Sequence, residues 1–154
     1  MSEAKQTRAV VEAVGLVGLI ASLMFVGMEI RQNTVAVRSA TIQAVSDQAM
    51  QLTLAMATDD QLPRLVYEMR QNGATQATLS TDDYLRLRLV VVAGLRRQEN
   101  LYQQVQNGVL SAGALRNVSF DFYTNPFVRE LWVTDRQYFD SGFAEYWDDI
   151  LSAD

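Results

Sequence analysis

The side chains best suited to binding a ligand are concentrated toward the C-terminal end of the chain. Of the two tryptophans, six tyrosines and six phenylalanines, ten lie between positions 120 and 147. Ligand pockets combine aromatic walls with a few polar groups. The candidates for such a pocket are Arg96, Arg97, Trp132, Tyr138 and Trp147. The aromatic residues could instead dock at the headgroup layer of a membrane or fill the core between short helices, and we favour the core.

Arginines and glutamates recur on two of the helices predicted for this region. One helix carries Arg96, Arg97 and Glu99, and the other carries Arg129, Glu130 and Arg136. If the two helices face each other, the arginines could clamp an anion or the carboxylate of a ligand. The alternative is structural pairing between arginine and glutamate, which we favour.

The absence of histidine and cysteine removes most catalytic chemistry from consideration. Ser-His-Asp and Cys-His catalytic arrangements, thiolate nucleophiles, disulfides and cysteine-type zinc sites are impossible without these residues. The isolated Glu68, Glu99 and Glu130 lack the histidines that accompany glutamates in metal sites of helical bundles. We therefore predict no catalytic, cofactor or metal site. An enzyme would have to work with aspartate, glutamate, arginine and tyrosine alone.

The size and charge of the chain narrow the classes of partner. Its 154 residues fit one domain and one anchoring segment. With 13 basic and 18 acidic residues, the net charge is −5. An acidic surface repels the phosphate backbone of nucleic acid, so we expect no nucleic-acid partner.

A long apolar segment near the N-terminus determines where the rest of the chain lies relative to a membrane. Between residues 13 and 28, Ser22 is the one polar side chain. Extended to residues 9–30, a helix would span roughly 33 Å, against a hydrocarbon core of about 30 Å. We predict a retained transmembrane anchor. A buried helix of a soluble protein is one alternative. A cleaved signal peptide is another, although no small-x-small cleavage site follows the run.

One face of this segment combines small and acidic residues. They are Glu12, Gly15, Gly18, Ser22 and Glu29, at spacings of 3, 3, 4 and 7. Small residues on one stripe let two helices approach closely in lipid, so the stripe predicts a packing seam against a partner helix or a second copy. Glycine is also common in membrane helices that have no such seam. The expected partners are therefore membrane lipid and a protein bound through the anchor helix.

The rest of the chain is predicted to form a small helical bundle. A heptad-like stripe of Val35, Ile42, Ala49 and Met56, with Val45 and Leu52 between them, could form a coiled coil or a core face, and we favour the core face. The predicted fold class is all-α, with an N-terminal transmembrane helix continuing into the bundle. The predicted divisions are a tail at residues 1–8, the anchor at 9–32 and the bundle at 33–154.

Cap residues, prolines and glycines delimit the predicted helices of the bundle. One starts after Asp59 or Asp60 and ends at Gly73; the others cover about residues 80–107, 111–123, 125–139 and 143–151. Ser80 and Asp83 lie at capping-box spacing, which predicts Ser80 as the cap of the second helix. The second of these is apolar on several faces, which places it at the centre of the bundle.

The junction FVGMEIRQNT at residues 25–34 resembles that of a group of small proteobacterial membrane proteins of unknown function. The C-terminal pattern is also similar: Pro126, Glu130, Trp132, Phe139, Phe143 and Tyr146. The resemblance implies a single-pass topology in the bacterial inner membrane and a helical domain, but no activity. The charges that flank the anchor favour, by a narrow margin, a C-terminal domain in the cytoplasm.

From these features we predict a membrane-anchored, non-enzymatic interaction protein, either an accessory subunit or a self-associating scaffold. The alternative is a ligand-sensing helical domain that binds a small molecule in its aromatic C-terminal region.

Overall fold

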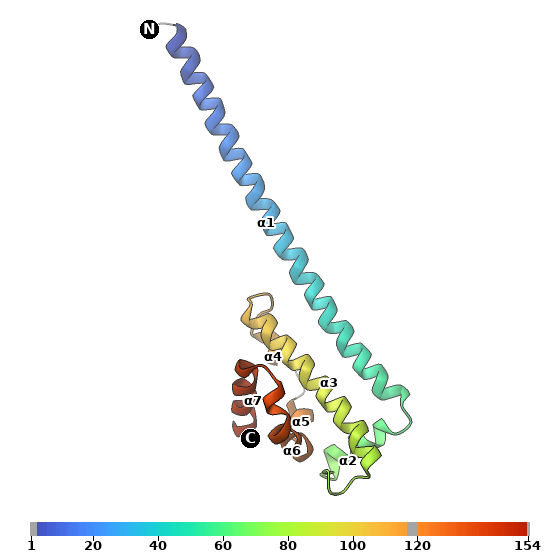
Figure 1. Ribbon diagram of the computed structural model, residues 1–154. Coiled ribbons are helices and arrows are strands. Elements are labelled where there is room, and N and C mark those ends of the chain that lie inside the picture. The colour runs from blue at the N-terminus through green and yellow to red at the C-terminus, as the bar shows by residue number, and fades with distance from the viewer. Residues whose placement is uncertain (1–2, 117–119, 154) are drawn as a thin grey trace. The chain divides into compact units, whose positions relative to one another are not determined.

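The computed structural model describes residues 3–116 and 120–153, and within these ranges it contains helices and no strands (Figure 1). The elements are α1 (Glu3–Thr58), α2 (Leu62–Gln71), α3 (Thr81–Gln106), α4 (Gly113–Arg116), α5 (Phe120–Tyr123), α6 (Pro126–Asp135), the 3-10 helix η1 (Arg136–Tyr138) and α7 (Ser141–Ala153). The predicted fold class, a long N-terminal helix followed by a small bundle, is confirmed. The chain divides into two compact units, Met1–Ala40 and Thr41–Asp154.

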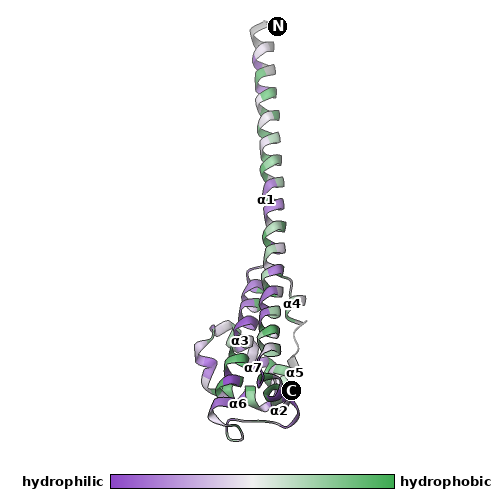
Figure 2. Ribbon diagram, turned by 90° about the vertical axis from the view of Figure 1, so that its right-hand side faces the viewer, coloured by the Kyte–Doolittle hydropathy of each residue, from purple (hydrophilic) through white to green (hydrophobic). Residues whose placement is uncertain are grey.

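The first unit is formed by the part of α1 up to Ala40, and Figure 2 shows the long hydrophobic run along this helix in green. Every side chain from residue 11 to residue 40 is exposed. Val11 and Phe25, for example, are 66% and 67% exposed. In the part of the chain that the structure describes, α1 is the one helix long and apolar enough to cross a membrane. The helix continues without interruption from the apolar run to Thr58.

The second unit is organised around α3, as its apolar sequence predicts. Leu87, Val91 and Leu95 are fully buried along one side of this helix. The other fully buried side chains come mostly from the helices around it: Leu65, Met69, Phe127, Val128, Phe143 and Trp147. In Figure 1, α6 and α7 lie along one side of α3, and the end of α1 lies along the other. The core is thus the space between α3 and the aromatic C-terminal helices.

The last turns of α1 belong to this second unit. Leu52 and Met56 are partly buried and pack against the core cluster. Val35 and Ile42, at the start of the predicted stripe, are 60% and 53% exposed. The stripe is therefore a core face at its C-terminal end, and its first positions are exposed.

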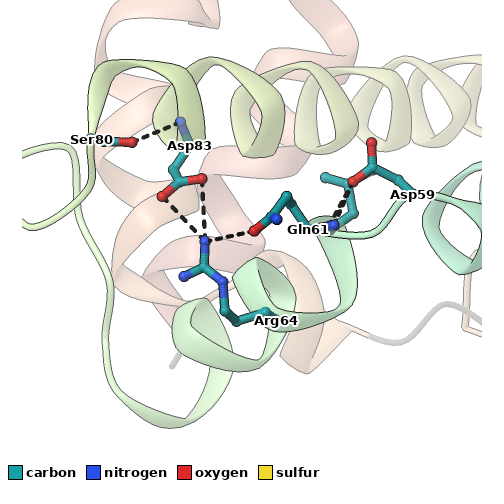
Figure 3. Close-up of polar contacts among 6 residues, drawn as sticks. Asp59, Gln61, Arg64, Ser80 and Asp83 are labelled. Carbon is teal, nitrogen blue, oxygen red and sulfur yellow. Dashed lines mark hydrogen bonds and ion pairs between the residues drawn. The ribbon is translucent and has the colours of Figure 1, made fainter.

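The start of α2 is fixed by the carboxylate of Asp59. Its Oδ1 accepts the backbone N–H groups of Gln61 at 2.8 Å and Leu62 at 2.9 Å. Figure 3 shows these bonds around Asp59. They favour the charged carboxylate and lower the pKa of Asp59 below its usual range. The N-cap position of α2 is Gln61, whose side chain makes no capping bond, so the Asp59 carboxylate binds the start of the helix from two residues upstream.

The start of α3 shows the predicted cap and an additional tertiary contact (Figure 3). The Ser80 hydroxyl accepts the backbone N–H of Asp83 at 3.2 Å, which satisfies one free donor at the helix end. The Asp83 carboxylate accepts a hydrogen bond from the Arg64 guanidinium at 3.2 Å. Asp83, in the first turn of α3, thus also connects α2 to α3.

The C-terminal helices begin and end differently from the prediction. The helix expected to reach residue 139 ends at Asp135 and is followed by η1. The Asp135 carboxylate is held by Arg88 of α3 at 2.6 Å. After η1 the backbone of Phe139 is extended, and its ring packs against Trp132 with the centroids 5.0 Å apart. These tertiary contacts require the chain to turn before residue 139.

Two other predicted boundaries also change. The last helix is predicted to begin at residue 143, but the Asp140 carboxylate accepts the N–H of Phe143 at 3.1 Å and caps a longer helix, α7. The last helix therefore begins at Ser141 and includes Gly142. The helix expected over residues 111–123 is represented by the short helices α4 and α5, and residues 117–119 lie outside the described part of the chain.

Gly94 provides a test of the packing around α3. A methyl group built on Gly94 would lie 2.7 Å from Cε1 of the buried Tyr123 ring, which is a steric overlap. We expect Gly94→Ala to lower the free energy of unfolding by about 1 kcal/mol or more, as overpacked cores do. In a Tyr123→Leu background the overlap is relieved, and the same change should be neutral or stabilise by up to about 1 kcal/mol through helix propensity. Urea unfolding of the natural chain, the two single variants and the double variant measures these free energies. If Gly94→Ala destabilised the Tyr123→Leu variant as much as the natural chain, steric overlap with Tyr123 would be contradicted.

Candidate functional site

The predicted packing seam lies on the exposed surface of α1. Glu12, Gly15, Gly18, Ser22 and Glu29 are all exposed and recur at helical spacings on one side of the helix. A Cβ atom added at Gly15 or Gly18 would meet no atom within 4 Å. Neither glycine is therefore required by packing within the chain, and the seam is open to another molecule.

Polar side chains along this part of α1 form hydrogen bonds within the helix. The Ser22 hydroxyl donates to the carbonyl oxygen of Gly18 at 2.9 Å. The Arg8 guanidinium pairs with the Glu12 carboxylate one turn later at 3.0 Å. Unsatisfied polar groups are costly in lipid, so bonds internal to the helix suit an apolar environment.

The predicted aromatic pocket is divided between the core and the surface. Trp132 and Trp147 are 4% and 1% exposed, and the Trp147 ring centroid lies 5.6 Å from that of Phe143. The indole N–H of Trp132 donates to Asp148 at 2.8 Å. Tyr138, in contrast, is 65% exposed. The interpretation of the aromatics as core is confirmed for the two tryptophans, whereas Tyr138 lies on the surface.

Arg96 fastens α3 to the connection between η1 and α7. It donates to the Glu99 carboxylate and to the backbone carbonyl of Tyr138, both at 2.8 Å, and it lies 4.1 Å above the Phe139 ring. Glu99 in turn accepts the backbone N–H of Asp140. This arrangement supports the structural interpretation of the Arg96–Glu99 pair.

Other arginines of the bundle also hold the fold together. Arg88 donates to Asp135 at 2.6 Å, and this bond raises the pKa of Arg88. Arg136 pairs with Asp148 at 2.7 Å and lowers the pKa of that carboxyl. Arg129 donates to the backbone carbonyl of Thr124 at 2.8 Å. In these contacts the arginines serve structural pairing, which the sequence analysis favours over a ligand clamp.

Arg97 lines a groove between the end of α1 and α3 that the sequence analysis did not identify. The groove has a volume of about 340 Å³ and is lined by Gln48, Gln51, Leu52, Ala93, Arg96, Arg97 and Asn100. The Nε atom of Arg97 is buried and, within the described part of the chain, has no hydrogen-bond partner. Its charge also acts on Tyr123, where it opposes the rise in pKa that burial causes.

No pattern in the sequence indicates that the amide side chains of this groove lie together. Gln48 and Gln51 flank the heptad-like stripe and are typical of a solvated helix edge. Asn100 belongs to another helix and donates to the Gln48 side chain at 3.5 Å, so the three amides come together only in the fold.

Comparison with known proteins assigns no role to the exposed run of α1 or to the groove beside Arg97. The chain matches no family model, no curated protein and no solved structure. Within residues 3–116 and 120–153, no three acidic side chains are grouped so that they could hold a metal ion. The candidate sites are therefore the exposed apolar run of α1 and the groove beside Arg97.

Because Trp147 is buried in the aromatic core and Tyr138 is exposed, we expect their substitution to change the free energy of unfolding by different amounts. Trp147→Ala should lower the free energy of unfolding by about 3–5 kcal/mol, because it leaves a cavity in the core. Tyr138→Ala should change it by no more than about 0.5 kcal/mol, because the ring is exposed and Arg96 bonds to the backbone there. Urea unfolding in a neutral detergent measures both values, and equal effects would contradict this division of the aromatics.

Proposed function

We propose that this chain is a membrane-anchored, non-enzymatic interaction protein, either an accessory subunit or a self-associating scaffold. The apolar run of α1 acts as its single transmembrane anchor in a bacterial inner membrane, and the helical bundle lies in the cytoplasm. The observation that carries the proposal is that a run long and apolar enough to span a bilayer is 0% buried within its own chain.

The energetics of exposed apolar side chains support the anchor. Near the centre of a membrane helix, each leucine, isoleucine, phenylalanine or valine favours insertion by about 0.3–0.6 kcal/mol. Leu19, Leu23 and Phe25 are each at least 60% exposed, so water would surround them if no membrane did. A contiguous apolar surface of this kind is typical of a membrane or protein contact.

The small-residue stripe supports a protein neighbour in the membrane. Its glycines leave open space on the helix surface, and the Ser22 hydroxyl is already satisfied within the helix. A second helix could therefore approach closely without leaving a polar group unpaired. The neighbour is either another membrane protein or a second copy of this chain. The buried tryptophans give no support to ligand sensing in the aromatic region.

The anchor is tested by placing charge in the apolar run. Each arginine near the centre of a membrane helix costs about 2.5–3.5 kcal/mol, so Leu19→Arg with Leu23→Arg should cancel the insertion energy. We expect the double variant to leave the membrane fraction during alkaline extraction, while the natural chain stays. A matched control is Gln43→Arg with Ala44→Arg, two exposed positions beyond the run, which should stay. Extraction of the natural chain, or a mature mass without residues 1–30, would contradict a retained anchor.

The packing seam is tested by comparing the same substitution, glycine to leucine, at two separate positions. Gly18→Leu fills the stripe and should reduce crosslinking to a second copy or a co-purified protein, because the helices can no longer approach closely. Gly27→Leu is the matched control, since Gly27 also faces open space but lies nine residues later, on the opposite side of the helix. Crosslinking in native membranes and native mass spectrometry provide the measurements. A strict monomer that co-purifies with nothing, or equal effects of both variants, would contradict the seam.

A further inference from the structure

We infer that the groove between the end of α1 and α3 binds the oxyanion of a small amphipathic molecule, with Arg97 as the residue that recognises its charge. The groove lies wholly within the unit Thr41–Asp154. The inference therefore stands or falls separately from the membrane anchor.

The charge of the groove selects an anion. Two arginines line it, of which Arg96 is paired with Glu99, and the lining residues that the structure describes include no aspartate or glutamate. The chain as a whole has a net charge of −5, so this absence of acids contrasts with the average surface. A positive groove on an acidic protein concentrates anions and excludes cations.

Arg97 differs from the other arginine of the groove in how its guanidinium is used. Arg96 is held by Glu99, by a backbone carbonyl and by the Phe139 ring. Arg97 is half-buried, and its buried Nε–H lacks a hydrogen-bond acceptor in the described part of the chain. A buried charged donor without a partner is costly. An oxyanion in the groove would supply negative charge and acceptor atoms to this guanidinium.

The remaining lining residues define the class of ligand. The side-chain amides of Gln48, Gln51 and Asn100 can donate hydrogen bonds to further oxygens. Leu52 and Ala93 contribute an apolar wall suited to a short hydrocarbon part. A volume of about 340 Å³ is at the small end of known ligand sites. The ligand is thus a small carboxylate or phosphate with an apolar portion, either a free molecule or the headgroup of an anionic lipid.

Binding can be followed at Arg97 itself. The full chain, labelled with ¹⁵N-arginine and held in a neutral detergent, is titrated first with inorganic phosphate and then with butyrate, while sodium chloride keeps the ionic strength constant. We expect the Nε–H resonance of Arg97 to shift and saturate with both anions, and more tightly with butyrate, which also contacts the apolar wall. No saturable shift with either anion would overturn the inference.

Three variants identify the groove as the site. Arg97→Gln should weaken binding by at least about tenfold, because it removes a charged hydrogen-bond donor, and butyrate affinity is then read by calorimetry. Arg70→Gln removes one charge from an exposed position on α2 and should change nothing. Ala93→Leu keeps both arginines but fills the groove, so it should also abolish binding. Equal weakening by Arg97→Gln and Arg70→Gln, or full binding by Ala93→Leu, would overturn the inference.

A last comparison distinguishes the two sources of the anion. Below its micellar concentration, dihexanoyl phosphatidylglycerol should bind more tightly than butyrate if the groove receives a lipid headgroup, and less tightly if it receives a free carboxylate. Dihexanoyl phosphatidylcholine, which has no net charge, should not compete in either case. Competition by the neutral lipid at the same concentration would show apolar binding without recognition of the anion and would overturn the role of Arg97.

Discussion

The burial of one side of α3 against the aromatic residues of α6 and α7 is the interaction on which the bundle depends. Leu87, Val91 and Leu95 are fully buried on α3, and Phe143 and Trp147 are almost fully buried on α7. Burying each such side chain contributes about 1.5–3 kcal/mol before the entropy of ordering is subtracted. The end of α1 and helix α2 then cover the parts of this core that the C-terminal helices leave open.

Arginine is the main polar connector of the bundle. Arg64, Arg88, Arg96 and Arg136 each make a contact that joins two segments of chain through a carboxylate or a backbone carbonyl. The planar guanidinium forms several directed hydrogen bonds at once, which a lysine ammonium cannot match. Exposed pairs of this kind add little stability. Their main effect is to fix where short helices stop and where the chain turns.

Local features of the fold could be predicted from the sequence, and features that depend on tertiary contacts could not. The bonds from Asp59 and Ser80 to the helix starts come from residues within three positions of each helix, so they could be predicted from local sequence. The end of α6 was not, because it depends on Arg88, which is 47 residues away from Asp135. For the candidate sites, the apolar run is visible as composition, whereas the groove brings together amides from two helices that show no pattern in the sequence.

Arg96 is shared between two parts of the bundle, and this makes them interdependent. Arg96 lines the groove, and its guanidinium holds the backbone at Tyr138, just before α7 begins. A molecule in the groove that drew this guanidinium toward itself would compete with that carbonyl. Occupancy of the groove and the order of the C-terminal helix would then be linked reciprocally, so that each changes the free energy of the other by the same amount.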